Sequence, residues 1–195
     1  MINMHGKYCI VPAWNTFTHN AFFDELCEQN RFIKITPREI YNKKSFVFVN
    51  GFLAGLIVIY KVLFAFLIKK GDFRKVKFDS INLGFCINER VISRSKLGNP
   101  SLPLILKNSF IVGFKYIILK KFLTENKVGL ILAGDEAYPD FSILLQLADL
   151  RKIKNKVIKG GPKAYICKFE SRILSAYPDK KIYKRLFSLI SKYCF

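Results

Sequence analysis

The pattern of apolar and polar positions is clearest over residues 127–169, where it predicts a strand, a polar turn, a helix and a second strand. The apolar run 128–133 has the length and continuous hydrophobicity of a strand buried in a parallel sheet, and it ends at the polar turn 134–139. A helix is indicated by apolar residues at helical spacing, which are Phe141, Leu144, Leu145, Ala148 and Ile153. A short strand over residues 155–159 follows. This order is typical of a parallel βαβ unit, so we expect the polar turn at the carboxyl edge of a sheet, where open α/β sheets bind ligands.

The rest of the chain adds elements of the same α/β kind. Further strands are predicted over residues 7–11 and 32–36, and residues 71–82 are expected to be irregular. Helices are predicted over residues 16–29, 89–96, 104–126 and 179–193. We therefore predict the α/β class, with a single Rossmann-like domain over residues 1–195 and a mainly parallel sheet flanked by helices. The first strand should lie beside the two strands of the βαβ unit.

The helix predicted over residues 104–126 has one strongly apolar face. The side chains expected to contact the core are Leu106, Phe110, Phe114, Ile117, Ile118 and Phe122. The lysines of this helix, Lys115, Lys120 and Lys121, are then expected in solvent.

Residues 46–68 form an almost wholly apolar stretch, which is interrupted by Asn50 and Lys61 and bracketed by lysine pairs. Its length suffices to cross a bilayer, and the cost of a central lysine, about 3 kcal/mol, can be offset by the surrounding apolar residues. A narrow stripe of small or polar residues recurs at helical spacing, namely Asn50, Ala54, Lys61 and Ala65. Three alternatives stay open: a helix packed in the domain, a helix lying in a membrane interface, and a spanning helix. Residues 46–49 could also form a separate strand.

Length and composition fit one well-buried domain. Of the 195 residues, 51% are hydrophobic, which excludes an intrinsically disordered chain. The five cysteines are scattered without a CxxC pair, and their number is odd. No metal site or disulfide framework is therefore expected, and a reducing compartment fits better. Residues 1–12 lack the features of a signal peptide, so we expect a cytoplasmic protein.

The net charge of +19, from 33 basic and 14 acidic residues, points to anionic partners. The basic residues are spread along the chain without the pattern of an RRM, KH or zinc-finger module, so nucleic acid is not the expected partner. The apolar stretch favours an anionic membrane surface instead. We expect peripheral association with the inner face of the cell membrane.

Short motifs in the second half of the chain carry a family resemblance. They are Gly134-Asp135-Glu136-Ala137-Tyr138, Leu147-Ala148-Asp149, Val157-Ile158, Gly160-Gly161-Pro162 and Tyr165. Together they resemble the last βαβ unit of the amino-terminal domain of bacterial capsule and lipopolysaccharide biosynthesis proteins related to GT-B glycosyltransferases. Residues 84–92 are similar to a further segment of these proteins, although Asn88 stands in place of a glycine and Glu89 in place of an aspartate. The likeness covers residues 79–170.

The resemblance implies a function that needs a second part. GT-B enzymes have two Rossmann-like domains, of which the carboxyl-terminal one mainly binds the sugar nucleotide and the amino-terminal one holds the acceptor. This chain has room for one domain and contains neither a GxGxxG nor a GxxxxGK[ST] phosphate loop, so no cofactor is expected. We expect the acceptor-side half of a glycosyltransferase. Its partners would be a lipid-linked or polysaccharide acceptor and a second domain or subunit that binds the sugar nucleotide.

The candidate catalytic residues are Asp135, Glu136 and His19. Asp135 and Glu136 are adjacent, so along an extended segment they would point in opposite directions, and at most one of them serves as acid or base. Asp135 could instead cap the following helix. His19, on the first predicted helix, is either a general base near the acceptor hydroxyl or an ordinary surface histidine.

The candidate acceptor-binding residues lie where predicted strands end, and they are Trp14, Asn15, Tyr138, Gly160 and Gly161. The ring of Tyr138 would suit a pyranose face, or it packs at the surface of the domain. The glycine pair is a weak signal, because glycine turns are common.

Two classes of function remain. The first is a glycosyltransferase, or its acceptor half, that works on a surface-polysaccharide precursor at the cytoplasmic face of the membrane. The second is a non-enzymatic, membrane-associated assembly or binding protein with a Rossmann-like fold. The sequence pattern does not choose between them.

Overall fold

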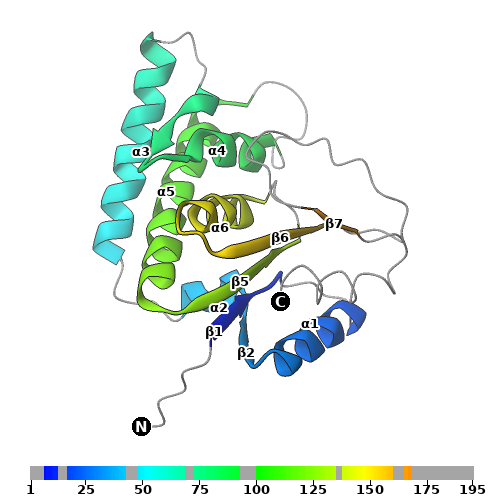
Figure 1. The fold of residues 1–195 in the computed structure, drawn as a ribbon. Coiled ribbons are helices and arrows are strands. Elements are labelled where there is room, and N and C mark those ends of the chain that lie inside the picture. Colours follow the sequence, from blue (N-terminus) through cyan, green and yellow to red (C-terminus); the bar gives the residue numbers. More distant parts are fainter. Residues whose placement is uncertain are drawn as a thin grey trace.

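The computed structural model describes residues 7–12, 17–42, 48–68, 73–92, 100–134, 138–159 and 165–167, and a five-stranded sheet lies at its centre (Figure 1). The strands follow the order β2-β1-β5-β6-β7. Four of them are parallel: β1 (Lys7–Ile10), β2 (Phe32–Ile35), β5 (Val128–Ala133) and β6 (Lys154–Lys159). The edge strand β7 (Tyr165–Cys167) is antiparallel to β6. The predicted mainly parallel sheet, which brings the first strand together with the two strands of the βαβ unit in the order β1-β5-β6, is confirmed.

Helices and a small hairpin connect these strands. The α-helices of the described residues are α1 (Phe17–Gln29), α2 (Pro37–Asn42), α3 (Phe48–Ile68), α4 (Leu83–Ile92), α5 (Leu102–Glu125) and α6 (Pro139–Leu150). A short 3-10 helix, η2 (Phe73–Lys75), and the hairpin of β3 (Lys77–Phe78) and β4 (Ile81–Asn82) join α3 to α4. The helices predicted over residues 16–29 and after residue 138 are confirmed. The helix predicted over residues 179–193 lies outside the described residues.

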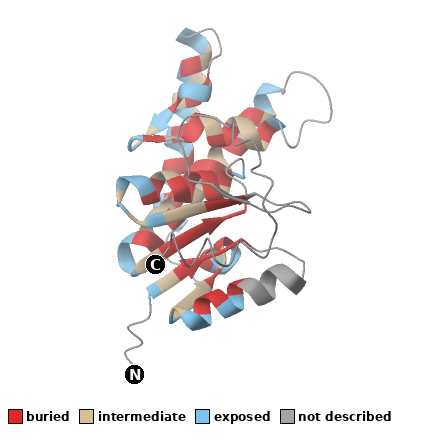
Figure 2. Cartoon of the chain, turned by 45° about the vertical axis from the view of Figure 1, so that its right-hand side comes forward, coloured by how far each residue is buried: buried red, intermediate tan, exposed pale blue. Residues whose placement is uncertain are grey.

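The strands send their side chains alternately into two apolar layers, as the two-residue period of a strand requires. On one face, next to α5 and α6, the buried strand residues are Ile10, Ile131, Ala133 and Val157. On the other face, next to Phe23, Leu26 and Cys27 of α1, they are Cys9, Leu130, Leu132 and Ile158. Helices therefore flank the sheet on both faces, and buried segments follow its strands (Figure 2). This architecture is compatible with a Rossmann-like fold.

The start of α3 and the connection from α3 to α4 each correct an expectation. A strand over residues 46–49 is wrong, because α3 already begins at Phe48. Residues 71–82 are not irregular throughout, since they contain η2 and the β3–β4 hairpin. Asp79 and Ser80 form the turn of this hairpin with φ angles of 47° and 69°, and a tight two-residue hairpin turn commonly requires such left-handed conformations.

The helix expected over residues 89–96 begins earlier, as α4 at Leu83. The side-chain oxygen of Asn82 accepts a hydrogen bond from the amide of Phe85 (3.1 Å), and this cap fixes the first turn. Gly84 is tightly enclosed there, because a Cβ at this position would lie 2.1 Å from the carbonyl oxygen of Phe73. Residues 84–92 are therefore helical throughout.

α5 is buried on more than the one face that the sequence indicated, because it lies between α3 and the pair α4 and α6. Of the expected core residues, Ile118 and Phe122 are buried, whereas the other four are partly buried: Leu106, Phe110, Phe114 and Ile117. The buried set also contains Ile105, Val112, Tyr116, Leu119 and Leu123. Lys115 is not in solvent as expected, since its side chain is 21% exposed and pairs with Asp140.

α3 lies on the outside of the molecule, beyond α5 (Figure 1). Gly51 contacts the ring of Phe114 and Gly55 contacts that of Phe110, so the two helices are antiparallel. About a third (33%) of the most apolar part of α3 is buried, and α3 is long and apolar enough to cross a membrane by length and composition. We call its exposed large side chains the outer face of α3; they are Phe48, Val49, Phe52, Leu53, Leu56, Ile57, Tyr60, Phe64, Leu67 and Ile68.

Candidate functional site

The connections of the chain change direction next to β1. From β1 the chain crosses through α1 to β2 on one side, and it later returns to β5 on the other side of β1. β1 and β5 are directly paired, with Ile10 opposite Ile131. A switch of this kind between parallel neighbours opens a crevice beyond their carboxyl ends, which is the usual ligand site of open α/β sheets.

Six of the predicted site residues follow strands that end at this edge. They are Trp14 and Asn15 after β1, Asp135 and Glu136 after β5, and Gly160 and Gly161 after β6. All six lie outside the described residues. Because β1, β5 and β6 are neighbours in the sheet, the three segments leave from one edge. The expected adjacency of the strands is confirmed, and the roles of the six side chains stay predictions.

The other two predicted residues lie at the start of α6 and in α1, the helix that follows β1. Tyr138 immediately precedes α6 and is 66% exposed, and its carbonyl oxygen accepts a hydrogen bond from the amide of Ser142 (2.9 Å). The ring is therefore accessible to a ligand. His19 belongs to α1, the helix that follows β1, and its role as a base stays a prediction.

A polar cluster that the sequence did not indicate joins α2, α5 and α6. Asp140 lies in the first turn of α6, and Tyr41 lies on α2, which follows β2. Lys115 Nζ donates to both carboxylate oxygens of Asp140, at 2.6 and 2.9 Å, and the hydroxyl of Tyr41 donates to Asp140 Oδ1 at 2.9 Å. The ammonium of Lys115 also lies 4.9 Å from the centre of the Tyr41 ring. One carboxylate thus holds three helices together.

The cluster is partly shielded from water, and this environment keeps the proton on Tyr41. The side chains of Lys115 and Asp140 are 21% and 26% exposed. Burial raises the pKa of Tyr41 well above its ordinary value, and the negative charge of Asp140 raises it further. Tyr41 therefore stays protonated and acts as a hydrogen-bond donor.

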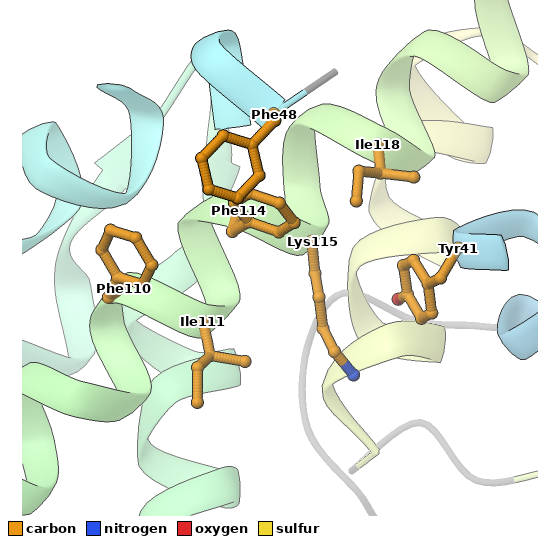
Figure 3. Close-up of a pocket in the computed structure, with 7 residues that line it drawn as sticks. All are labelled: Tyr41, Phe48, Phe110, Ile111, Phe114, Lys115 and Ile118. Carbon is orange, nitrogen blue, oxygen red and sulfur yellow. The ribbon is translucent and has the colours of Figure 1, made fainter. Parts of the chain in front are cut away.

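An apolar cavity of about 460 Å³ opens beside Lys115, between α2, α3 and α5 (Figure 3). Its lining consists of Tyr41, Phe48, Phe110, Ile111, Phe114, Lys115 and Ile118. Figure 3 shows Lys115 extending from α5 toward Tyr41, with Phe48 close to Phe114. Among these seven residues only Lys115 is charged, so the cavity suits an apolar chain better than a sugar.

Sequence reasoning missed the cluster because its members are far apart along the chain. Lys115 and Asp140 are 25 residues apart, and Tyr41 and Asp140 are 99 residues apart. The one local signal is the position of Asp140, directly after Pro139 at the start of a predicted helix. That position indicates a negatively charged first turn, but it does not identify the partners.

Neither the thiol of Cys86 nor a metal cluster offers a further reactive site among the described residues. Burial raises the pKa of the Cys86 thiol to about 12, so it is not a nucleophilic thiolate. Within the described part of the chain, no three side chains of the metal-binding types lie close enough together to hold an ion. A hollow of about 500 Å³ at the opposite, amino edge of the sheet contains five basic residues: Lys7, Lys127, Arg151, Lys152 and Lys154. We call it the basic hollow.

Comparison with known proteins does not identify the chain, since no family model, no curated protein and no solved structure matches it. The resemblance to capsule and lipopolysaccharide proteins therefore depends on the short motifs of residues 79–170.

Proposed function

We propose that this chain is the acceptor-side half of a glycosyltransferase of surface-polysaccharide biosynthesis and binds a lipid-linked sugar acceptor beyond β1 and β5. The observation that carries the proposal is the direct pairing of β1 with β5 at the point where the connections change direction. Polar and aromatic residues that suit a sugar follow both strands, namely Trp14, Asn15, Asp135 and Glu136.

The proposed roles follow from the chemistry of glycosyl transfer to a hydroxyl group. Either Asp135 or Glu136 takes the proton of the acceptor hydroxyl, and the exposed ring of Tyr138 stacks on a sugar face. The apolar cavity beside Lys115 suits the lipid part of the acceptor. The donor sugar nucleotide is assigned to a second domain or subunit.

Binding measurements with the full chain test this proposal. The probe is a short-chain polyprenyl diphosphate sugar in detergent micelles, followed by isothermal titration calorimetry. We expect saturable binding that weakens about tenfold or more in the Asp135→Ala, Glu136→Ala double variant, because an acceptor hydroxyl loses its charged hydrogen-bond partner. Asp149→Ala, which removes an exposed carboxylate of α6, is the matched control and should leave binding unchanged.

The same titrations with UDP, GDP and CMP sugars test whether the chain also binds the donor sugar nucleotide. We expect no saturable binding at micromolar concentration, since the sequence has no phosphate loop. Micromolar binding of one of these nucleotides would contradict an acceptor-only half.

The alternative function is that of a non-enzymatic, membrane-associated assembly or binding protein. The exposed outer face of α3 favours it, because association with a membrane needs no catalytic group. A chain that binds membranes but neither the acceptor nor a sugar nucleotide would support this alternative.

A further inference from the structure

The outer face of α3 is the most extensive exposed apolar feature of the described residues. Of the fourteen large hydrophobic side chains exposed there, ten belong to α3. Leu67 is 84% exposed and Phe48 is 64% exposed, at opposite ends of a helix of 21 residues. A continuous apolar surface along a whole helix marks an interaction site, whereas single exposed apolar side chains are common on any protein surface.

α3 packs through its small residues and leaves its large ones outside. A Cβ at Gly113 of α5 would lie 2.9 Å from the carbonyl oxygen of Ala54 and 3.0 Å from the Cα of Gly55, so the two backbones are in close contact. A helix of a water-soluble core gains most stability by burying its large apolar side chains. Close approach through small residues, with large apolar residues outward, is instead the arrangement of helices that contact lipid.

Basic residues border the outer face of α3. Lys61 on α3 donates a hydrogen bond to the carbonyl oxygen of Lys77 (3.0 Å), and Arg74 and Lys75 lie on η2, whose Phe73 ring packs on α3. Arg74, Lys75 and Lys77 are exposed. In the sequence, lysine pairs at residues 43–44 and 69–70 bracket the helix. This border is complementary to anionic lipid headgroups.

We propose that the outer face of α3 docks into the interface of an anionic membrane, with the helix lying in the plane of the bilayer. A membrane fits better than a second copy of the chain, because two copies with a net charge of +19 would bring their basic borders together. α5, the other apolar helix, lies between α3 and the rest of the domain, so inserting both helices across a bilayer would require removing α5 from the core. The inference does not depend on the acceptor site.

Flotation of the full chain with lipid vesicles tests the docking. Vesicles of phosphatidylcholine with phosphatidylserine should carry the protein, and those without it should carry less, by about fivefold for each basic residue at the surface. The Leu56→Glu, Leu67→Glu double variant should float about tenfold less or lower still, since two exposed apolar contacts become charged. Leu150→Glu, at an exposed apolar position of α6, is the matched control and should float like the unaltered chain.

Salt and extraction separate this placement from the other arrangements. High salt should weaken flotation without abolishing it, because the apolar contribution is not screened. Alkaline carbonate should release the protein from cell membranes. Resistance to carbonate would show a spanning helix instead. A protein that does not float would contradict membrane docking and would show that the outer face of α3 is covered by protein. A dimer that the double variant dissociates would contradict it too, because the outer face of α3 would then bind a second copy of the chain.

Discussion

Asp140 neutralises a lysine that the fold has largely removed from water. It accepts hydrogen bonds from Lys115 and Tyr41, so its loss would leave an ammonium group and a partly buried hydroxyl without their acceptor. We expect Asp140→Ala to lower the free energy of unfolding by about 2 kcal/mol. Urea denaturation monitored by circular dichroism measures this change.

The exposed pair of Lys121 and Glu125 on α5 provides the control for this variant. Their charged atoms are 3.5 Å apart and both side chains are more than a third exposed. Glu125→Ala should therefore cost less than about 0.5 kcal/mol, because water screens exposed ion pairs. Equal losses of unfolding free energy in the two variants would show that the Asp140 cluster stabilises the fold no more than an exposed ion pair does.

Asp79 gives the hairpin of β3 and β4 a pH-dependent attachment to α5. The hydrogen bond from Lys120 (2.7 Å) lowers the pKa of Asp79 below its ordinary value of 3.8. Partial burial acts in the opposite direction, and a hydrogen bond from Tyr116 (2.9 Å) lowers the pKa further. A carboxylate whose folded pKa is lowered stabilises the protein fully above its unfolded pKa. This contribution is lost as the pH falls through the folded pKa.

We therefore expect Asp79→Asn to destabilise the chain by about 0.5 kcal/mol at neutral pH, and this difference should shrink as the pH falls through the folded pKa of Asp79. Asparagine tolerates the positive φ of this position, so the turn itself is kept. Thermal denaturation from neutral to acidic pH measures the difference between the two proteins. A difference that grows as the pH falls would contradict this assignment.

At the scale of elements, the contact between α3 and α5 depends on glycine. A Cβ at Gly113 would meet backbone atoms of Ala54 and Gly55, which cannot move independently of α3. We expect Gly113→Ala to destabilise the chain by about 1–2 kcal/mol, although alanine is the better helix former. Chemical denaturation of the purified variant measures this effect.

Gly51 offers a matched comparison on α3. A Cβ there would lie 2.8 Å from the ring of Phe114, which is a side chain that can turn aside. Gly51→Ala should be close to neutral, because the gain in helix propensity offsets the small displacement. A larger loss at Gly51 than at Gly113 would show that the two helices do not meet as described.

Sequence reasoning succeeded for the strands and failed for the faces of the two apolar helices. The run that became β5 is apolar throughout because both faces of a parallel sheet are covered, and such runs are recognisable. α3 is apolar all round, so periodicity could not tell which side packs. The side of α3 that packs is set by the size of the side chains, because Gly51, Gly55 and Gly113 allow α3 and α5 to approach closely.

At the scale of the whole molecule, the edge of the candidate site could be predicted, whereas its described polar cluster could not. Each predicted polar segment follows a strand, and the strands are neighbours because right-handed crossovers bring them together. The cluster of Tyr41, Lys115 and Asp140 depends on the packing of three helices, which no local pattern contains. Its existence follows only from the assembled fold.

The central claim is that a ligand binds at the carboxyl edge of β1 and β5. Amide hydrogen exchange of the full chain, with and without the polyprenyl diphosphate sugar, tests it most directly. Residues of β5 should exchange slowly in both states, since they lie in the buried centre of the sheet. The acceptor should slow exchange in the segments that follow β1 and β5, residues 11–16 and 134–138. Slowing confined to the basic hollow at the amino edge, or no slowing at any residue, would contradict the account.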